Sequence, residues 1–579
     1  MSSRETNIIP IEEVFKMRYL EQYVQTVVNY SSRYNNQCSY SYAPINLVGK
    51  YVKYPCYGDF PETYFLRSYG KWWKTSKASQ KEYRPQDFDL LAAEDYVTLE
   101  FGSVVIPREI FIYEVYNPGA IVRIWGRLKT TPNWVLLWEG FPQKCAPRSR
   151  KFSPPLRKLN VLINLVRIEF NQNHLEYHTA LDAVLLCGYQ PESQFQYEII
   201  KFTEVNILKA LSTITVSDVE NERKRDKDPI DNFSMLPNEI ILKILEYLDL
   251  KSLSRCAQVN TRLNKLCQNQ ALYQNISLKI YWYLVDSKAL EFFKKKIGNI
   301  KKLDLSWCNE TQLSFNRRLH FDYYSKLQSI LESSSQTITH LCLNNNYFVD
   351  DELLHRIAAC TELKDLRLHH TFNWIRSPLD KLGHLVTLDL SLTNIIDQDL
   401  IQILISNPHL EHLVLDLCEK LVLIDSIVET VTLCNKKLKT WSSWKAYSFT
   451  SAGIRKFGSC ENLEELDLGW CLMCRDPGDC LAAIANGCKK LRRLILSEWR
   501  GVTDQLLMPI IHSCKELTQI DLIGIKGITA ESCEKALFLL PKLRLLDVSF
   551  CDSLRQHEVE IWREQYPHIT IQRSHSDYS

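Results

Sequence analysis

The sequence predicts a multidomain α/β protein that contains an antiparallel β-sandwich, a small three-helix unit and a C-terminal repeat solenoid. Residues 95–189 alternate apolar and polar side chains, residues 234–273 carry three short apolar helical patterns, and a leucine frame recurs from residue 299 onward. At 579 residues the chain is also too long to fold around one hydrophobic core. We therefore expect several folded parts in sequence.

Composition narrows the classes of partner. The net charge of +2, with 24% charged residues, gives no electrostatic footprint for nucleic acid or an acidic membrane. No apolar run approaches the ~20 residues that cross a bilayer, and the N-terminus "MSSRETNIIPIEEVFKMRYL" lacks the apolar segment of a secretion signal. The 19 cysteines are then expected as reduced thiols in the cytoplasm, with the nucleus as an alternative.

Residues 1–84 are expected to form one amphipathic helix near the start, followed by irregular chain. From Gln22 to Gln80 the sequence is rich in Tyr, Asn and Ser, as in "YVQTVVNYSSRYN" and "RSYGKWWK". We expect the aromatic side chains to anchor this irregular part.

Residues 85–195 have the period of β-strands. "YVTLEFGSVVIPREIFIYEVY" alternates apolar and polar residues and is followed by a turn at Asn117-Pro118-Gly119. Further stretches of strand length, "AIVRIWGRL", "NWVLLWEG", "NLVRIEF" and "LDAVLLCGY", are separated by polar loops. Short strands with regular turn signals predict an antiparallel sandwich or barrel. Residues 196–231, with "RKRDK" among interleaved acids, are expected to be a charged linker.

Residues 279–579 repeat the frame L-x-x-L-x-L-x-x-C/N about ten times. The starts are mostly 22 to 28 residues apart, which is the range of leucine-rich repeats. Each unit reads as a short strand plus a helix, and only a stack of units buries their apolar faces. A degenerate copy between Leu438 and Trp441 loses its third apolar position to Ser443. The regular copies start at Ile300, Ile338, Leu363, Leu385, Leu410, Leu463, Leu491, Leu517 and Leu543.

Many cysteines recur with this frame, so we expect them to be small buried side chains between repeats. One set lies three residues before the leading leucine and another lies eight residues after it. These sets are Cys360, Cys460, Cys488 and Cys514, and Cys308, Cys418, Cys471 and Cys551. Cys471, Cys474 and Cys480 could be taken for metal ligands, but no histidine lies nearby. We therefore expect no metal site.

Residues 232–278 pack three apolar helices into a short segment. In "SMLPNEIILKILEYLDLKSLSRCAQVN", Pro237 and Glu239 favour a helix start. Asp249 and Thr261 are expected to cap the second and third helices. A unit this small buries only part of its apolar surface. The remainder faces either the first repeats, as a cap on the solenoid, or another protein, and the pattern leaves both alternatives open.

The same residues carry a resemblance. "LPNEIILKILEYLDLKSLSRCAQVNTRLNKLCQNQALYQNISL" resembles an F-box, with Tyr273 where the consensus usually has Trp. Together with the cysteine-containing repeats, this resemblance identifies the chain as a member of the F-box/LRR family. It implies a non-catalytic substrate receptor that docks on the Skp adaptor of a cullin-RING ubiquitin ligase. It also implies adaptor contacts at Leu236, Pro237, Glu239, Ile240, Ile244, Leu248, Leu250 and Leu253.

The resemblance extends to members of that family in which a β-sandwich precedes the F-box. "DYVTLEF", "YNPGAIVRI", "LEELDLGWC" and "LRLLDVSFC" carry it, over roughly residues 20–575. It implies a place at the mitochondrial surface and turnover of mitophagy receptors by the proteasome. Those relatives carry a basic, apolar N-terminal targeting stretch that this sequence lacks. The sandwich itself resembles discoidin-like, galactose-binding-like jelly rolls, whose ligands bind at loop tips such as the Asn117–Ala120 turn.

The solenoid offers a surface for protein substrates. The residue between the second and third apolar positions of the frame points to the concave face, and it is often aspartate. Large aromatic residues follow three positions later, and aromatics beside charges are typical anchors of protein interfaces. The candidate residues are Asp304, Trp307, Asp389, Trp444, Asp467, Trp470, Asp521, Asp547 and Phe550. The alternative is that these aspartates cap turns and that the aromatics pack on neighbouring repeats.

No catalytic motif is apparent. The sequence has no H-E-x-x-H, G-x-G-x-x-G, P-loop or G-x-S-x-G pattern, so we expect neither an enzyme nor a cofactor. The expected partners are the Skp adaptor, the cullin, the RING subunit and protein substrates. Two alternatives are a leucine-rich-repeat scaffold and a carbohydrate- or lipid-binding protein without a ligase role.

Overall fold

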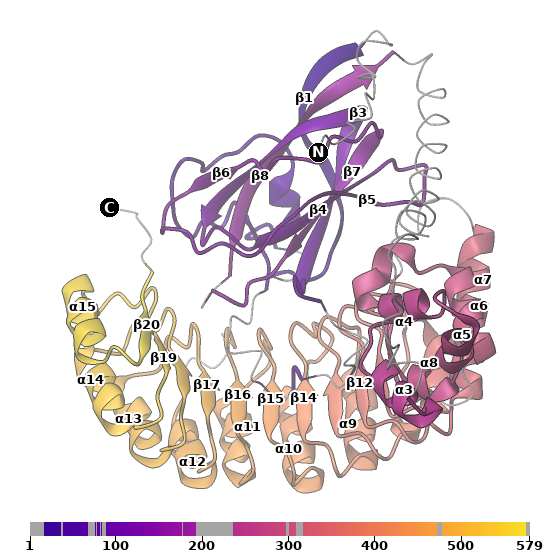
Figure 1. Ribbon diagram of the computed structural model, residues 1–579. Helices are drawn as coiled ribbons and strands as arrows, with labels where there is room; N and C mark the ends of the chain where they lie inside the picture. The colour runs from indigo at the N-terminus through magenta and orange to yellow at the C-terminus, as the bar shows by residue number, and fades with distance from the viewer. Residues whose placement is uncertain are drawn as a thin grey trace. The chain divides into compact units, whose positions relative to one another are not determined.

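The structure is a computed structural model of the chain (Figure 1). It describes residues 17–35, 39–67, 76, 78–80, 83, 89–175, 178–192, 236–296, 300–308, 317–471 and 477–574. Two compact units are formed, one from Met1–Lys71 and Asp89–Glu246, the other from Trp72–Phe88 and Tyr247–Ser579. The expected linker 196–231 and Cys474 lie outside the described residues.

The first unit contains the antiparallel β-sandwich that the sequence predicts. Its strands run in the order β2-β8-β1-β3-β7-β4-β5, with β6 beside β3. The long strand β3 joins both layers, because residues 95–105 pair with β7 and residues 106–116 pair with β8. Side chains such as Leu99, Ile124 and Val184 fill the core. The elements are β1 (Met17–Tyr30), η1 (Pro44–Leu47), β2 (Tyr64–Phe65), β3 (Asp95–Tyr116), β4 (Ile121–Arg127), β5 (Val135–Glu139), β6 (Arg150–Phe152), β7 (Ile163–Phe170) and β8 (Ala180–Pro191).

The expected N-terminal helix is wrong, since these residues form strand β1 of the sandwich. Residues 17–23 of β1 pair with β8, and residues 24–30 pair with β3. Val24, Val27 and Val28 have helical spacing in the sequence, but the open edges of β3 and β8 supply hydrogen bonds to an extended chain. The sandwich therefore begins well before residue 85, the boundary expected from the sequence.

The turn at Asn117–Ala120, expected as a ligand loop, is closed by its neighbours. The buried carboxylate of Glu114 accepts hydrogen bonds from the Gly119 N–H at 2.8 Å and from Arg150 Nε at 2.6 Å. Burial raises the pKa of Glu114, and the Arg150 cation opposes that rise. Gly119 has a φ of 111°, and a Cβ there would lie 2.0 Å from the Gln143 carbonyl oxygen. The turn therefore requires glycine at position 119.

Three short helices form where the sequence predicts them. They are α3 (Asn238–Leu245), α4 (Leu250–Cys256) and α5 (Thr261–Cys267), followed by η4 (Gln270–Tyr273). Asp249 caps α4 as expected, because its carboxylate accepts a hydrogen bond from the Ser252 N–H at 2.6 Å. The cap of α5 is Asn260 rather than the expected Thr261, since Asn260 Oδ1 accepts from the Leu263 N–H at 2.8 Å.

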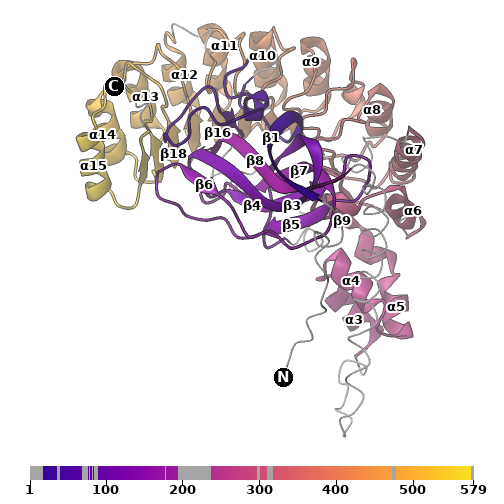
Figure 2. The same cartoon turned by 90° about the horizontal axis from the view of Figure 1, so that it is seen from above.

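The second unit is dominated by a parallel, 12-stranded sheet in sequence order from β9 to β20. The strands line the inner side of a curved row and the helices lie on its outer side (Figures 1 and 2). The strands are β9 (Asn275–Ser277), β10 (Lys302–Asp304), β11 (His340–Cys342), β12 (Asp365–Arg367), β13 (Thr387–Asp389), β14 (His412–Val414), β15 (Thr440–Ser442), β16 (Glu465–Asp467), β17 (Arg493–Ile495), β18 (Gln519–Asp521), β19 (Leu545–Asp547) and β20 (Thr570–Gln572).

Helices alternate with these strands, as the repeat frame predicts. Each strand's middle residue is buried between the sheet and the helices, for example Leu366 and Leu494. The helical elements are η5 (Lys279–Leu284), α6 (Ser287–Lys296), α7 (Arg317–Ser333), α8 (Asp351–Ala358), η6 (Leu379–Lys381), α9 (Asp397–Ser406), α10 (Ile424–Cys434), α11 (Ser451–Arg455), η7 (Lys456–Ser459), α12 (Cys480–Gly487), α13 (Asp504–Ser513), α14 (Ala530–Leu539) and α15 (Gln556–Gln565).

Strands β10 to β19 match the predicted copies, and the sheet adds one strand at each end. Strand β9 falls inside residues 232–278, so the last residues of the expected three-helix unit already belong to the solenoid. β9 pairs in parallel with β10, and the Leu278 N–H donates to the Asp304 carbonyl at 2.8 Å. The parallel sheet is thus continuous across residue 278, which was the expected domain boundary.

The recurring cysteines are buried, as predicted. Their thiols lie against backbone carbonyls of a preceding repeat. Cys418 Sγ donates to the Leu390 carbonyl at 3.0 Å, and Cys551 Sγ donates to the Leu522 carbonyl at 3.1 Å. Burial raises the pKa of both thiols to about 12. A thiol this small fits between stacked repeats, and its raised pKa disfavours the reactive thiolate.

Candidate functional site

Helix α3 leaves part of its apolar stripe open. Ile241 and Leu245 are buried, whereas Ile240 is 48% exposed and Ile244 is 39% exposed. The backbone of Pro237 starts the helix, because its carbonyl accepts from the N–H groups of Ile240 and Ile241 at 3.1 Å. Pro237 and Glu239 are exposed and Leu236 is half-buried. The expected contact residues on this segment therefore present a continuous accessible edge.

The chain from Tyr247 to Val259 departs from the expected set of contact residues. Leu253 is only 1% exposed, so its expected contact with an adaptor is corrected to a core position. Leu248 and Leu250 are half-buried. Tyr247 and Val259 are strongly exposed apolar side chains that the sequence analysis did not select. The apolar period of the helices could have indicated them, but it does not distinguish the covered face from the open one.

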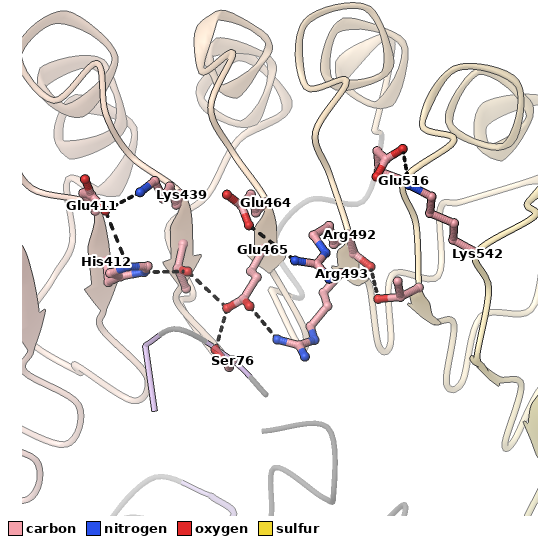
Figure 3. Close-up of polar contacts among 12 residues, drawn as sticks. Ser76, Glu411, His412, Lys439, Glu464, Glu465, Arg492, Arg493, Glu516 and Lys542 are labelled. Atoms are coloured by element: carbon pink, nitrogen blue, oxygen red, sulfur yellow. Dashed lines mark hydrogen bonds and ion pairs between the residues drawn. The ribbon is translucent and has the colours of Figure 1, made fainter. Parts of the chain in front are cut away.

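A row of polar side chains crosses the inner face of the solenoid (Figure 3). Parallel pairing aligns Glu465 on β16 with Arg493 on β17 and with Thr440 on β15. Arg493 Nη1 donates to Glu465 Oε1 at 2.5 Å, and Thr440 Oγ1 donates to Glu465 Oε2 at 3.1 Å. His412 Nδ1 lies 2.9 Å from Thr440 Oγ1. We call these four residues the inner polar row.

A second row lies one residue earlier in each repeat. It contains the ion pair between Lys439 and Glu411 at 2.5 Å, and a further pair between Lys542 and Glu516 at 2.6 Å lies three residues before strands β18 and β19 (Figure 3). Arg492 lies 3.9 Å from Glu464 in the same row. Opposite charges on adjacent repeats thus hold the rim of the inner face in register.

Arg367 on β12 forms a buried ion pair on the same face. Its Nε and Nη2 donate to the two carboxylate oxygens of Asp365, each at 2.8 Å. The Asp365 carboxylate raises the pKa of the Arg367 guanidinium despite its burial. The same Nη2 also donates to the Gln80 carbonyl oxygen at 2.7 Å, across 287 residues of sequence.

Ser76, residues 78–80 and Tyr83 are called the strap below, and Ser76 and Gln80 contact this inner face. Ser76 Oγ donates to Glu465 Oε2 at 2.6 Å (Figure 3). Tyr83 is 1% exposed, and burial raises the pKa of its hydroxyl well above the usual range, with Cys342 and Asp304 adding to that rise. The strap therefore contacts Glu465 on β16 and Arg367 on β12. The sequence analysis treated these residues as irregular chain and did not predict these contacts.

The predicted inner-face aspartates hold the turns that follow their strands. The carboxylates of Asp304, Asp389 and Asp547 accept hydrogen bonds from the backbone N–H two residues on, at 2.9, 3.0 and 2.9 Å. Asp467 accepts from the Gly469 N–H at 2.9 Å in the same way. This arrangement is the turn-capping alternative, and a part for these carboxylates in substrate binding stays a prediction.

The predicted aromatic anchors lie at or beside a repeated left-handed backbone position. Trp307, Trp470 and Phe550 have φ values of 68°, 59° and 58°. Trp307 and Trp444 are buried, and lysines lie over their rings: Lys279 Nζ is 4.0 Å from the Trp307 centroid and Lys445 Nζ is 4.7 Å from that of Trp444. Trp470 and Phe550 are half-buried. Their role as anchors for a substrate stays a prediction.

Substitution Asp521→Asn is expected to stabilise the protein at neutral pH. Burial, and next the carboxylate of Asp547, raise the pKa of Asp521 well above its usual range. The folded chain therefore holds this proton more tightly than the unfolded chain, so wild-type stability falls as pH rises above about 4. Asparagine keeps an oxygen to accept from the Ile523 N–H at 3.1 Å.

Thermal unfolding at pH 7 and pH 4.5 tests this expectation. The variant should melt at a higher temperature than wild type at pH 7, and the gap should narrow at pH 4.5. A lower melting temperature for the variant at pH 7 would contradict the assignment. Asp552→Asn is the control, because Asp552 carries an exposed carboxylate that pairs with Lys526 at 3.2 Å.

Two further searches concern membranes and metals. Within the described ranges, no helix has both the length and the apolarity to cross a bilayer. The same part of the chain contains no cluster of three or more His, Cys, Asp or Glu side chains placed to bind a metal ion. Cys471 and Cys480 are both buried.

Known proteins are similar to this chain in sequence. The F-box-like family profile matches residues 233–279. The chain is 30% identical over 592 residues to F-box/LRR-repeat protein 4 of Bos taurus, covering 96% of this chain and 91% of that protein. It is 27% identical over 236 residues to Antagonist of mitotic exit network protein 1 of Saccharomyces cerevisiae, covering 38% and 42% of the two chains.

Among solved structures, a complex of yeast Rad7 and Elc1 is similar to this chain. The match covers 66% of this chain and 98% of that one, at 17% identity and a TM-score of 0.38.

Proposed function

The chain belongs to the F-box/LRR-repeat family, and on that basis we propose that it is the substrate-recognition subunit of an SCF (Skp–cullin–F-box) ubiquitin ligase. Members of this family are typically non-catalytic substrate receptors. In this proposal the F-box binds the Skp adaptor, the cullin and RING subunit join through that adaptor, and the solenoid holds the protein target.

The observation that carries the proposal is the open apolar edge of α3. Burying an isoleucine side chain is worth roughly 1.5–3 kcal/mol, and Ile240 and Ile244 leave much of that energy unused in the isolated chain. Exposed Tyr247 and Val259 extend the surface available to a partner.

The joint between F-box and solenoid supports the mechanism. Strand β9, which follows the F-box helices, is hydrogen-bonded to β10 along its whole length. Ubiquitin transfer in this proposal depends on holding a target lysine near a charged conjugating enzyme, which replaces a dilute encounter by a local one. The β9–β10 pairing joins the residues that directly follow the F-box helices to the target-binding sheet.

Substituting Ile240→Asp together with Ile244→Asp tests the proposal. Wild type is expected to bind purified Skp adaptor, and the variant is expected to bind it about thirtyfold more weakly, since an interface hot spot contributes about 2 kcal/mol. Both positions are accessible, so the variant should keep the melting temperature of wild type. Isothermal titration and affinity capture measure the loss.

Ile561→Asp on α15 is the matched control, because Ile561 is 47% exposed and lies outside the F-box. It should bind the adaptor as wild type does. The proposal fails if wild type does not bind the adaptor, or if the double variant binds it as tightly as wild type does.

For the target, we propose mitophagy receptors and a place at the mitochondrial surface. The support is the resemblance to the sandwich-containing members of the family and the 30% identity to F-box/LRR-repeat protein 4. Affinity purification with neddylation blocked, in the same assay series, would recover adaptor and target together. Recovery of the adaptor with unrelated targets would remove the mitophagy part and keep the ligase part.

A further inference from the structure

We propose that the inner face of the solenoid between Arg367 and Glu465 is a peptide-binding groove, and that the strap of this same chain (Ser76, residues 78–80 and Tyr83) is its resident occupant. This inference rests on the proposed function in one respect: a target that uses this face has to displace the strap. The groove itself is argued from contacts within the second unit.

The first contact between groove and strap is the hydrogen bond from the Ser76 hydroxyl to Glu465. Arg493 and Thr440 hold the Glu465 carboxylate in place through contacts within the solenoid that do not involve the strap. Its Oε2 still accepts the Ser76 hydroxyl at 2.6 Å, and Ser76 is fully buried there. A carboxylate fixed in this way binds a neutral hydroxyl donor and repels a second negative charge.

The second contact is the hydrogen bond from Arg367 to the backbone carbonyl oxygen of Gln80. Arg367 is oriented by both oxygens of Asp365, and the second N–H of its Nη2 donates to the Gln80 carbonyl oxygen at 2.7 Å. The Gln80 side chain is exposed. Any residue type supplies a carbonyl, so this contact fixes the path of a peptide and places no demand on the side chain at that position.

The third feature is the buried aromatic ring of Tyr83. Tyr83 is buried, with Cys342, Asp304 and Asp365 among its electrostatic neighbours. In the described part of the chain its hydroxyl has no hydrogen-bond partner. The ring therefore supplies the binding energy, and the orphaned hydroxyl opposes it.

The strap is also shaped for this path. The Ser79 N–H and hydroxyl both donate to the Ser76 carbonyl oxygen, at 3.1 and 2.9 Å, which closes a turn next to the Glu465 contact. Ala78 is buried. The groove thus accepts a short turn that starts at a hydroxyl residue and is followed, seven positions after that residue, by an aromatic side chain.

The test uses the full-length chain and a fluorescent synthetic peptide that copies residues 72–88. In wild type the tethered strap is present at an effective concentration on the order of 1 mM, so it excludes a free peptide at micromolar concentration. Tyr83→Ala and Ser76→Asp release the strap, by loss of the ring and by repulsion from Glu465. Each variant is expected to bind the peptide at least about tenfold more tightly than wild type does.

Two matched controls give the opposite result. Gln80→Ala keeps the carbonyl that Arg367 binds, and Tyr83→Phe keeps the ring and removes the orphaned hydroxyl, so both should exclude the peptide as wild type does. Adding Glu465→Met and Arg493→Met to Tyr83→Ala removes the acceptor of the Ser76 hydroxyl and should abolish the gain in peptide affinity. Melting temperatures confirm that each variant folds.

The proposal is overturned if the peptide binds wild type and Tyr83→Ala equally, or if it binds none of the variants. Adaptor binding is measured on the same samples and should not change, because the F-box is untouched. Absence of peptide binding together with normal adaptor capture would contradict the groove proposal and leave the ligase proposal intact. Peptide binding without adaptor capture would remove the ligase proposal alone.

Discussion

Trp441→Ala is expected to lower the free energy of unfolding of the solenoid by about 3–5 kcal/mol. Trp441 is fully buried and occupies the middle of β15, where other strands have leucine or isoleucine. Its ring contacts Phe457 with a centroid distance of 5.1 Å, and its indole Nε1 donates to Ser443 Oγ at 2.7 Å. Alanine would leave a large cavity and an unpaired buried hydroxyl.

The position within the array increases this effect. Each repeat is stabilised by its neighbours, so a cavity at β15 weakens its interfaces with both β14 and β16. Urea unfolding followed by far-UV circular dichroism measures the change. Phe538→Ala, which removes an aromatic that is 79% exposed on α14, is the control and should change stability little. A loss below about 1 kcal/mol for Trp441→Ala would contradict this account.

Arg367→Ala is expected to lower the free energy of unfolding by a similar amount, about 3–5 kcal/mol, because it leaves a buried charge unpaired. Removal of the guanidinium leaves the buried Asp365 carboxylate without its two charge-assisted hydrogen bonds. The Gln80 carbonyl loses its donor as well. Lysine should rescue little, because an ammonium group does not reproduce the two-pronged contact with Asp365.

The double variant Arg367→Ala with Asp365→Ala separates the two parts of this cost. If the uncompensated charge dominates, the double variant should be more stable than Arg367→Ala alone. Arg376→Ala is the control, since Arg376 is largely exposed and lies 3.8 Å from Asp399, and surface pairs contribute about 0–1 kcal/mol. Equal stability losses at Arg367 and Arg376 would show that the buried pair has no special weight.

The repeat array could be predicted in detail because its signal is local and periodic. Leu366 and Leu494 recur in a fixed frame, and each frame folds into the same strand and helix. The copy at Trp441 looks degenerate in the sequence. In the structure the ring fills the leucine site and Ser443 binds the indole nitrogen, so two departures from the frame compensate each other.

The N-terminal strand and the open face of the F-box could not be predicted in the same way. Val24 and Val27 have the spacing of a helix, yet pairing with β3 and β8 makes the segment a strand, with register shifts between Val24 and Thr26 and between Val27 and Asn29. Ile240 and Ile241 are adjacent and equally apolar, yet one is half-exposed and the other buried. Periodicity identifies an apolar face, whereas packing decides which part of it is covered.

The sequence by itself determined the order of sandwich, F-box and solenoid, because each is encoded by a period that neighbouring residues share. It also determined the buried cysteines and the family. Only the tertiary structure decided that Ser76 meets Glu465 across 389 residues of sequence and that Gln80 meets Arg367 across 287. Contacts of that separation leave no local pattern, since a hydroxyl or a carbonyl acquires its partner only when the repeats have stacked.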